Sequence, residues 1–104
     1  MTRPPQWAVL AKALTQHQPV RARYHGHERV LCPHALGWKH GRPKLLALQS
    51  SGTTTTAQPT HQRWRSMFID EIENPKIINE PWQTASNYSQ TSNCFDTIEQ
   101  ALEP

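Results

Sequence analysis

Long apolar runs are absent from this 104-residue sequence. No stretch approaches the roughly 20 apolar residues that a membrane-spanning helix needs, so we expect no membrane segment. Residues 1–6 lack an apolar h-region, which predicts that no secretory signal is present. The two cysteines, Cys32 and Cys94, are too few and too far apart to suggest a disulfide framework. These absences indicate a cytoplasmic protein with free thiols.

Acidic residues are nearly missing from the first 65 positions. Glu28 is the only acid there, against ten of the chain's eleven Lys and Arg residues, which gives a net charge of +9. Residues 66–104 reverse this, with Lys76 the only base and seven Asp and Glu residues, for a net charge of −6. Such an asymmetric field bears on partners rather than on fold. We expect one surface that attracts polyanions; the alternative is that the two sets of charges fold against each other.

The chain is long enough for one small domain made of short elements. Apolar residues make up 36% of it and nine prolines interrupt it, so long helices are not expected. Trp7, Leu10 and Leu14 recur at helical spacing, and Pro5 suits a first helical turn. We therefore predict a short amphipathic helix over residues 5–16.

From Val20 onward, short apolar segments lie between turns marked by Gly and Pro, a pattern typical of strands. We expect strands at residues 20–24, 29–32 with a continuation at 35–38, 44–49, 64–69 and 76–78. Pro33 is expected to interrupt the second strand. The polar residues 50–61 predict a long loop, and residues 70–75 a turn. Five short strands with tight turns predict a mainly β domain that folds as a small, strongly bent barrel.

The C-terminal part combines a polar stretch after Pro81 with a periodic ending. Phe95, Ile98 and Leu102 fit one face of a helix for which Asn93 is a suitable N-cap. We predict an acidic helix over 93–103 that docks on its own barrel or on a second copy. The expected organisation is an N-terminal lead with a short helix (1–18), the barrel (19–81), and a polar linker with an acidic segment (82–104).

One series of residues resembles the WYL domain family, and most of all its short, stand-alone bacterial members. The series starts with Tyr24-x-Gly26-x-x-Arg29-Val30-x-x-Pro33-His34-x-Leu36-Gly37, continues with Leu45-x-Ala47-x-Gln49, and ends with Trp64-Arg65 and Phe68-Ile69-Asp70-Glu71-Ile72. The likeness spans about residues 20–98 and includes Asn87, Tyr88 and Phe95 in the tail. The tripeptide that names the family falls on Pro43-Lys44-Leu45, and Phe68 and Glu71 replace expected basic residues. The resemblance implies an Sm-like or SH3-like barrel that senses a nucleic acid or a nucleotide.

Basic and aromatic residues alternate along the expected barrel, which favours a phosphate-bearing ligand. The basic set is Arg21, Arg23, Arg29, Lys39, Arg42, Lys44, Arg63 and Arg65. Guanidinium groups bind phosphate through a planar fork of donors, and exposed aromatic rings stack on bases. The residues that we predict to contact the ligand are Arg29, His34, Lys44, Arg65, Tyr24, Trp64, Gln49 and Ser51. The alternative is that the aromatic rings fill the core and the arginines are solvated or structural.

Metal binding and catalysis have weaker support. His25, His27, Cys32 and His34 lie within ten residues, but their spacing matches no zinc pattern. A Cys–His couple would also need an orienting group and an oxyanion hole, and nothing in the sequence supplies them. We therefore expect no cofactor, no metal and no enzymatic activity. The prediction is a ligand-sensing regulatory module that binds single-stranded nucleic acid or a nucleotide; the alternative is a non-catalytic protein-interaction subunit, such as a homodimer or a component of a complex.

Overall fold

The computed structural model describes residues 3–52, 63–82 and 95–102 of the chain. Its elements, in chain order, are α1 (Pro5–Gln16), β1 (Val20–Tyr24), β2 (His27–Lys39), β3 (Arg42–Gly52), β4 (Arg63–Phe68), the 3-10 turn η1 (Ile69–Glu71), β5 (Ile72–Ile77) and β6 (Thr97–Ala101). The predicted loop beyond Gly52 and the predicted linker at 83–94, with Cys94, lie outside the described residues. Across the described part of the chain, no helix has the length and apolarity needed to cross a membrane.

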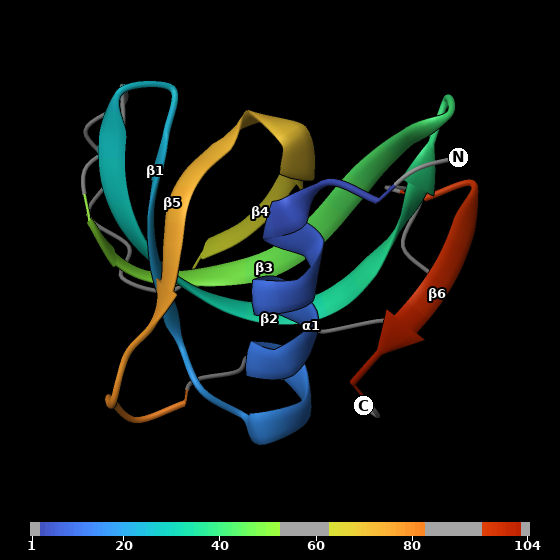
Figure 1. Cartoon of the computed structure of the whole chain (residues 1–104). Helices are drawn as coiled ribbons and strands as arrows, with labels where there is room; N and C mark the ends of the chain where they lie inside the picture. Colours follow the sequence, from blue (N-terminus) through green and yellow to red (C-terminus); the bar gives the residue numbers. More distant parts are fainter. Residues whose placement is uncertain (1–2, 53–62, 83–94, 103–104) are drawn as a thin grey trace.

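The strands form one antiparallel sheet in the order β4-β3-β2-β1-β5, with β6 added on β2. The long strand β2 pairs with β3 along one edge. Its other edge is shared, because residues 27–31 pair with β1 and residues 35–38 pair with β6. Figure 1 shows β2 curving across the molecule from the β1 hairpin to β6. Two strands that are distant in sequence therefore follow each other along a single edge.

The mainly β fold with a short N-terminal helix is confirmed, but the closed five-stranded barrel is wrong. The described strands number six, and their ladder stays open between β4 and β5. The turn η1 carries the chain from β4 to β5, and α1 lies across the concave side of the bent sheet (Figure 1). The Gln6 side chain of α1 donates a hydrogen bond of 2.9 Å to the carbonyl oxygen of Ile72 in β5. The helix therefore provides a hydrogen-bond partner for one backbone carbonyl of β5, a strand that a closed barrel would have paired with β4.

The core lies between α1 and the concave face of the sheet. Leu10 and Ala13 of α1 are fully buried, and the ring of Trp7 stacks on Trp38 of β2 with centroids 5.3 Å apart. The helix ends at Gln16 and is capped by His17, which takes a left-handed conformation (φ 54°). The predicted helix at 5–16 is confirmed. Trp38 lies in the core, which agrees with the alternative that the aromatic rings fill the interior.

Two short hairpins fix the order of β1, β2 and β3. Each has a two-residue loop of His followed by Gly, at His25–Gly26 and at His40–Gly41. All four residues have positive φ, between 50° and 80°. Positive φ at both loop positions matches the right-handed twist of the flanking strands, and glycine adopts it without strain. These loops set the register that brings β2 and β3 side by side over most of their length.

Three predicted boundaries differ from the structure. Pro33 does not interrupt β2, because it lies beside a bulge at the interval where β2 changes neighbours, and a missing N–H is tolerated there. The predicted turn at 70–75 is instead η1 followed by the start of β5, so the strand predicted at 76–78 is the end of a longer one. The predicted acidic helix over 93–103 is wrong within the described residues, since 97–101 is strand β6.

Candidate functional site

Two arginines converge on one glutamine side chain at the end of the core. Gln49 Oε1 accepts hydrogen bonds from Arg29 Nη1 at 3.3 Å and from Arg65 Nε at 3.2 Å. The three residues come from β2, β3 and β4, which are neighbours in the sheet. Arg29 and Gln49 are nearly inaccessible, at 7% and 5% exposure, whereas Arg65 is half-buried. We call this group the Arg29–Gln49–Arg65 cluster.

Register explains why these side chains share a face. Gln49 lies opposite Leu31, and Arg65 lies opposite Ala47. Leu31 and Ala47 belong to the hydrophobic core, so their direct partners across the strands point to the same concave side. The cluster therefore continues the core face of the sheet with polar groups.

Tyr24 extends the cluster toward β1. The Arg29 guanidinium lies 5.4 Å from the centre of the Tyr24 ring, which is within cation–π range. The Tyr24 hydroxyl contacts Glu71, and burial, together with this carboxylate, raises the pKa of the phenol. The Tyr24 ring also stacks on the ring of His25, with centroids 4.0 Å apart. Tyr24 thus holds Arg29 in place while keeping its own proton.

His34 lies in a second group, which we call the His34 aromatic cluster. Its ring stacks on Trp82, with centroids 5.0 Å apart, and meets the edge of Trp64 at 4.8 Å. Nδ1 donates a 2.7 Å hydrogen bond to the carbonyl oxygen of Cys32, so in the neutral ring the proton resides on Nδ1. Burial lowers the pKa of His34, and the nearby charge of His17 lowers it further. The cluster favours a neutral imidazole inside an aromatic environment.

The two clusters separate Arg29 from His34, although both are among the residues predicted to contact the ligand. Trp64 and Arg65 are adjacent in β4, and adjacent strand residues point to opposite faces of a sheet. Arg65 joins Gln49, whereas Trp64 joins His34. The predicted ligand residues are therefore divided between the concave face and the opposite face.

Some of the other basic residues pair with acidic ones. Arg42 Nη2 lies 3.0 Å from Asp70 and 2.8 Å from Glu71, and its guanidinium covers the Phe68 ring at 3.8 Å. Lys44 lies over the same ring at 4.9 Å, away from the Arg29–Gln49–Arg65 cluster. Hydrogen bonds from Arg42 lower the pKa of Glu71. Three members of the basic set, Arg21, Lys39 and Arg42, therefore pair with acidic residues.

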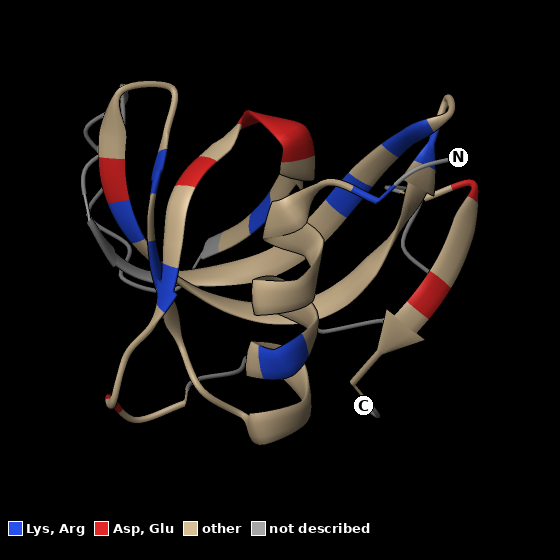
Figure 2. Cartoon of the chain, viewed as in Figure 1, with Lys and Arg blue, Asp and Glu red and all other residues tan. Residues whose placement is uncertain are grey.

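The C-terminal acids continue this pairing on the other side of the β2–β3 hairpin. Lys39 Nζ lies 3.4 Å from Asp96, and Glu99 pairs with Arg3. Figure 2 shows the acidic stretches of η1 and β6, in red, on either side of this partly blue hairpin. Part of the charge asymmetry of the sequence is thus an internal complementarity between described residues.

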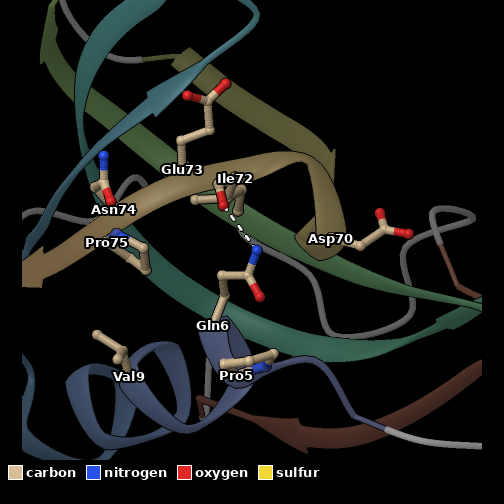
Figure 3. A pocket seen from close by; sticks show the side chains of 8 residues that line it. All are labelled: Pro5, Gln6, Val9, Asp70, Ile72, Glu73, Asn74 and Pro75. Atoms are coloured by element: carbon tan, nitrogen blue, oxygen red, sulfur yellow. Dashed lines mark hydrogen bonds between the residues drawn. The ribbon is translucent and has the colours of Figure 1, made fainter.

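A cavity of about 570 Å³ lies between the first turns of α1 and strand β5. Figure 3 shows Gln6 reaching from the helix to its bond with Ile72, with the carboxylates of Asp70 and Glu73 nearby. None of the predicted ligand residues lines this cavity. Its acidic rim makes it a poor site for a phosphate.

The histidines and the cysteine of the weak metal pattern have other contacts. His25 Nε2 lies 2.7 Å from Glu71, and Cys32 and His34 are fully buried in β2. Over residues 3–52, 63–82 and 95–102, no group of three or more His, Cys, Asp or Glu side chains is arranged to hold a metal ion.

Sequence reasoning missed Trp82 and His17, whose rings meet at 5.5 Å beside His34. The available signal was a lone tryptophan at the start of a polar stretch, which rarely occurs without a packing partner. Of the predicted residues, Ser51 lies in β3 opposite Val30, and its side chain is outside the described part of the structure.

Comparison of the chain with protein-family models, with curated proteins and with solved structures gives no match. The resemblance to WYL domains therefore stays a prediction from residues and spacing.

Proposed function

We propose that this chain binds a phosphate-bearing ligand, a nucleotide or single-stranded nucleic acid, at the Arg29–Gln49–Arg65 cluster, and that it senses this ligand rather than transforming it. The observation that supports the proposal is the convergence of two guanidinium groups on one neutral amide oxygen. The WYL resemblance, which includes all three residues, points to the same class of ligand.

The physical argument concerns the quality of the acceptor. Charge-assisted hydrogen bonds from a guanidinium to a phosphate oxygen are shorter and roughly twice as strong as bonds to a neutral acceptor. The two bonds to Gln49 Oε1 are long, at 3.2 and 3.3 Å. A phosphate that displaced Gln49 would give both arginines a better partner. Arg65, which is half-buried, provides the accessible side of the cluster.

A structural role for the arginines is the competing explanation, since they link β2, β3 and β4 through Gln49. The substitution Gln49→Glu separates the two explanations. A carboxylate between the guanidinium groups would satisfy a structural role at least as well as the amide. It would also occupy the place of an anionic ligand and repel it.

The binding experiment uses the full chain with two probes, a fluorescein-labelled ten-nucleotide oligothymidylate and ATP, at 50 and 200 mM salt. We expect oligonucleotide binding that weakens with salt, with a slope of log K against log salt of about −0.7 for each phosphate neutralised. Gln49→Glu should weaken binding at least about tenfold, which corresponds to about 1.4 kcal/mol.

The matched control is Gln100→Glu, which makes the same change in net charge on β6, where Gln100 contacts α1. We expect this variant to bind within about twofold of the wild type, because surface charges away from the site are screened. Equal weakening by both variants would reduce the effect to overall charge. If the wild type bound neither the oligothymidylate nor ATP at 50 mM salt, the proposed function would be rejected.

The alternative, a protein-interaction subunit, has support of its own. Strand β6 closes an edge of β2 through backbone and charged contacts, and such an edge is a common site for protein association. Because β2 carries both Arg29 and this edge, ligand binding and protein association would act on one strand.

A further inference from the structure

The edge of β2 that β6 covers has specific groups for an acidic extended segment. Asp96 Oδ2 accepts a 2.8 Å bond from the backbone N–H of His40, and Asp96 Oδ1 lies 3.4 Å from Lys39 Nζ. Three residues later, Glu99 Oε1 accepts a 2.6 Å bond from Trp38 Nε1, and Glu99 also pairs with Arg3. These donors lower the pKa of both carboxyl groups, so both stay charged at neutral pH. The edge therefore recognises two carboxylates at a fixed spacing.

Backbone contacts add a steric requirement. The N–H of Asp96 bonds the Trp38 carbonyl, and the N–H of Leu102 bonds the His34 carbonyl, both at 2.7 Å. A Cβ atom on Gly37 would lie 2.1 Å from the Thr97 carbonyl oxygen, so glycine is what allows β6 to approach so closely. The edge is thus shaped for one strand in one register.

Strand β6 contributes little apolar burial in return. Thr97, Ile98 and Glu99 are exposed, and Ile98 is 36% exposed. Apart from the half-buried Phe95 and Leu102 on either side of it, its attachment rests on hydrogen bonds and ion pairs, and all of these contacts would form equally well if the strand came from another molecule. Reciprocal exchange of a strand conserves every such contact and is a low-cost route to a dimer.

The length of chain before β6 permits such an exchange. Twelve residues, 83–94, separate Trp82 from Phe95. A chain of that length can span up to about 40 Å, which exceeds the longest dimension of the described structure, 36 Å. The connection is long enough to reach a neighbouring molecule.

We propose that residues 34–39 of β2 form a strand-acceptor edge and that β6 of a second copy of this chain occupies it, so that two molecules exchange their C-terminal strands. Within one molecule the connection keeps β6 at a high effective concentration, which favours the monomer in dilute solution. Exchange becomes competitive as the protein concentration rises. The proposal is independent of phosphate binding at the Arg29–Gln49–Arg65 cluster.

A charge-reversal experiment on the full chain tests the edge directly. The strand-reversed variant carries Asp96→Lys and Glu99→Lys, and the edge-reversed variant carries Arg3→Glu and Lys39→Glu. In each variant alone, strand and edge repel each other. In a mixture, the unaltered β6 of the edge-reversed variant can dock on the unaltered edge of the strand-reversed variant. The two reversed surfaces have opposite charges again, but the introduced lysines cannot accept the bonds from the His40 N–H and Trp38 Nε1, so the first of these contacts is the stronger one.

Native mass spectrometry of the mixture, with one variant labelled with ¹⁵N, should show a heterodimer as the main dimeric species. The variants alone should give monomers. A mixture that contains only monomers and homodimers would overturn the proposal, provided that circular dichroism shows both variants to be folded.

A second measurement covers the case in which a variant does not fold. Labelled and unlabelled wild-type protein, mixed at millimolar concentration, should form a mixed dimer, and Gly37→Val should reduce its fraction at least fivefold. A mixed dimer that is unaffected by Gly37→Val, or its complete absence, would also overturn the proposal.

Discussion

The two parts of one edge of β2 are held by different forces. Residues 27–31 pair with β1, whose side chains alternate strictly between buried and exposed and which is joined to β2 by a two-residue loop. Residues 35–38 pair with β6, which is mostly exposed and lies about 60 positions away in the sequence. On this one edge of β2, β1 is held mainly by burial of apolar side chains, and β6 is held mainly by polar contacts.

The difference has energetic consequences. Burial of apolar surface contributes about 25 cal/mol per Å², whereas an exposed ion pair typically contributes about 0–1 kcal/mol. The β1 side should therefore carry global stability, and the β6 side should open locally at little cost. Local opening is the property that strand exchange requires.

The largest expected effect contrasts Leu31 with Ile98. Leu31 is fully buried in the β1 half, so Leu31→Ala should lower the free energy of unfolding by about 2–5 kcal/mol. Ile98 is 36% exposed on β6, so Ile98→Ala should cost less than about 1 kcal/mol. Guanidinium unfolding followed by tryptophan fluorescence gives both values. Equal losses would mean that β6 is as much a part of the cooperative core as β1.

The N-terminal helix and the hairpins could be predicted from the sequence because their causes are local. Pro5 and the spacing of Trp7, Leu10 and Leu14 specify the helix, and the His-Gly pairs specify the turns. The extended conformation of β6 depends on residues far away in the sequence, namely the edge of β2 with which it pairs and Gly37 in that edge. Phe95, Ile98 and Leu102 fit helical spacing as well as they fit a strand, and the β-branched pair at 97 and 98 was the one local indication of a strand.

The candidate site could be predicted in part. Arg29, Gln49, Arg65 and Tyr24 were all expected to bind ligand, and the sheet brings the first three into hydrogen-bond contact. The separation of His34 from Arg29 follows from simple alternation, because positions 29 and 34 are an odd number apart; the predicted interruption at Pro33 hid this, and β2 in fact runs through it.

The second prediction concerns a substitution that should disrupt the pairing with β6 and leave the pairing with β1 intact. Gly37→Val places a side chain where the Thr97 carbonyl lies, so β6 should detach while the β1 half stays intact. The amide of Leu102, which bonds the His34 carbonyl, should exchange with deuterium at least about a hundredfold faster, as measured by hydrogen exchange and NMR. Amides of β1 should change less than about fivefold.

Gly26→Ala is the matched control. Gly26 has φ 80° and no atom within 4 Å of an added Cβ, so alanine there introduces backbone strain without obstructing any strand. It should lower global stability by about 1 kcal/mol and leave the relative exchange of Leu102 unchanged. Equal release of Leu102 in both variants would show that β6 responds to general destabilisation rather than to the contact at Gly37.

The smallest expected effect concerns His34, which lies in β2 between the residues that pair with β1 and those that pair with β6. Its carbonyl accepts the N–H of Leu102 after β6, and its ring lies between Trp64 and Trp82. Burial lowers its pKa below the ordinary value of 6.5, so the folded state favours the neutral ring more than the unfolded state does. The unfolded chain therefore binds more protons just below pH 6.5, and stability should fall as the pH decreases through that value.

The third prediction is a pH-dependent stability that His34 dominates between pH 6.5 and 5. The carboxyl groups with lowered pKa values, Glu71, Asp96 and Glu99, lose their contribution only at lower pH, since their ordinary values are 4.5 or less. Guanidinium midpoints should decrease over this range in the wild type and flatten in His34→Asn, which can still donate to the Cys32 carbonyl. Because the charge of His17 also lowers the pKa of His34, His17→Gln should make the decrease shallower. If the guanidinium midpoint of His34→Asn depended on pH as steeply as that of the wild type, the pH dependence would come from other groups and not from His34.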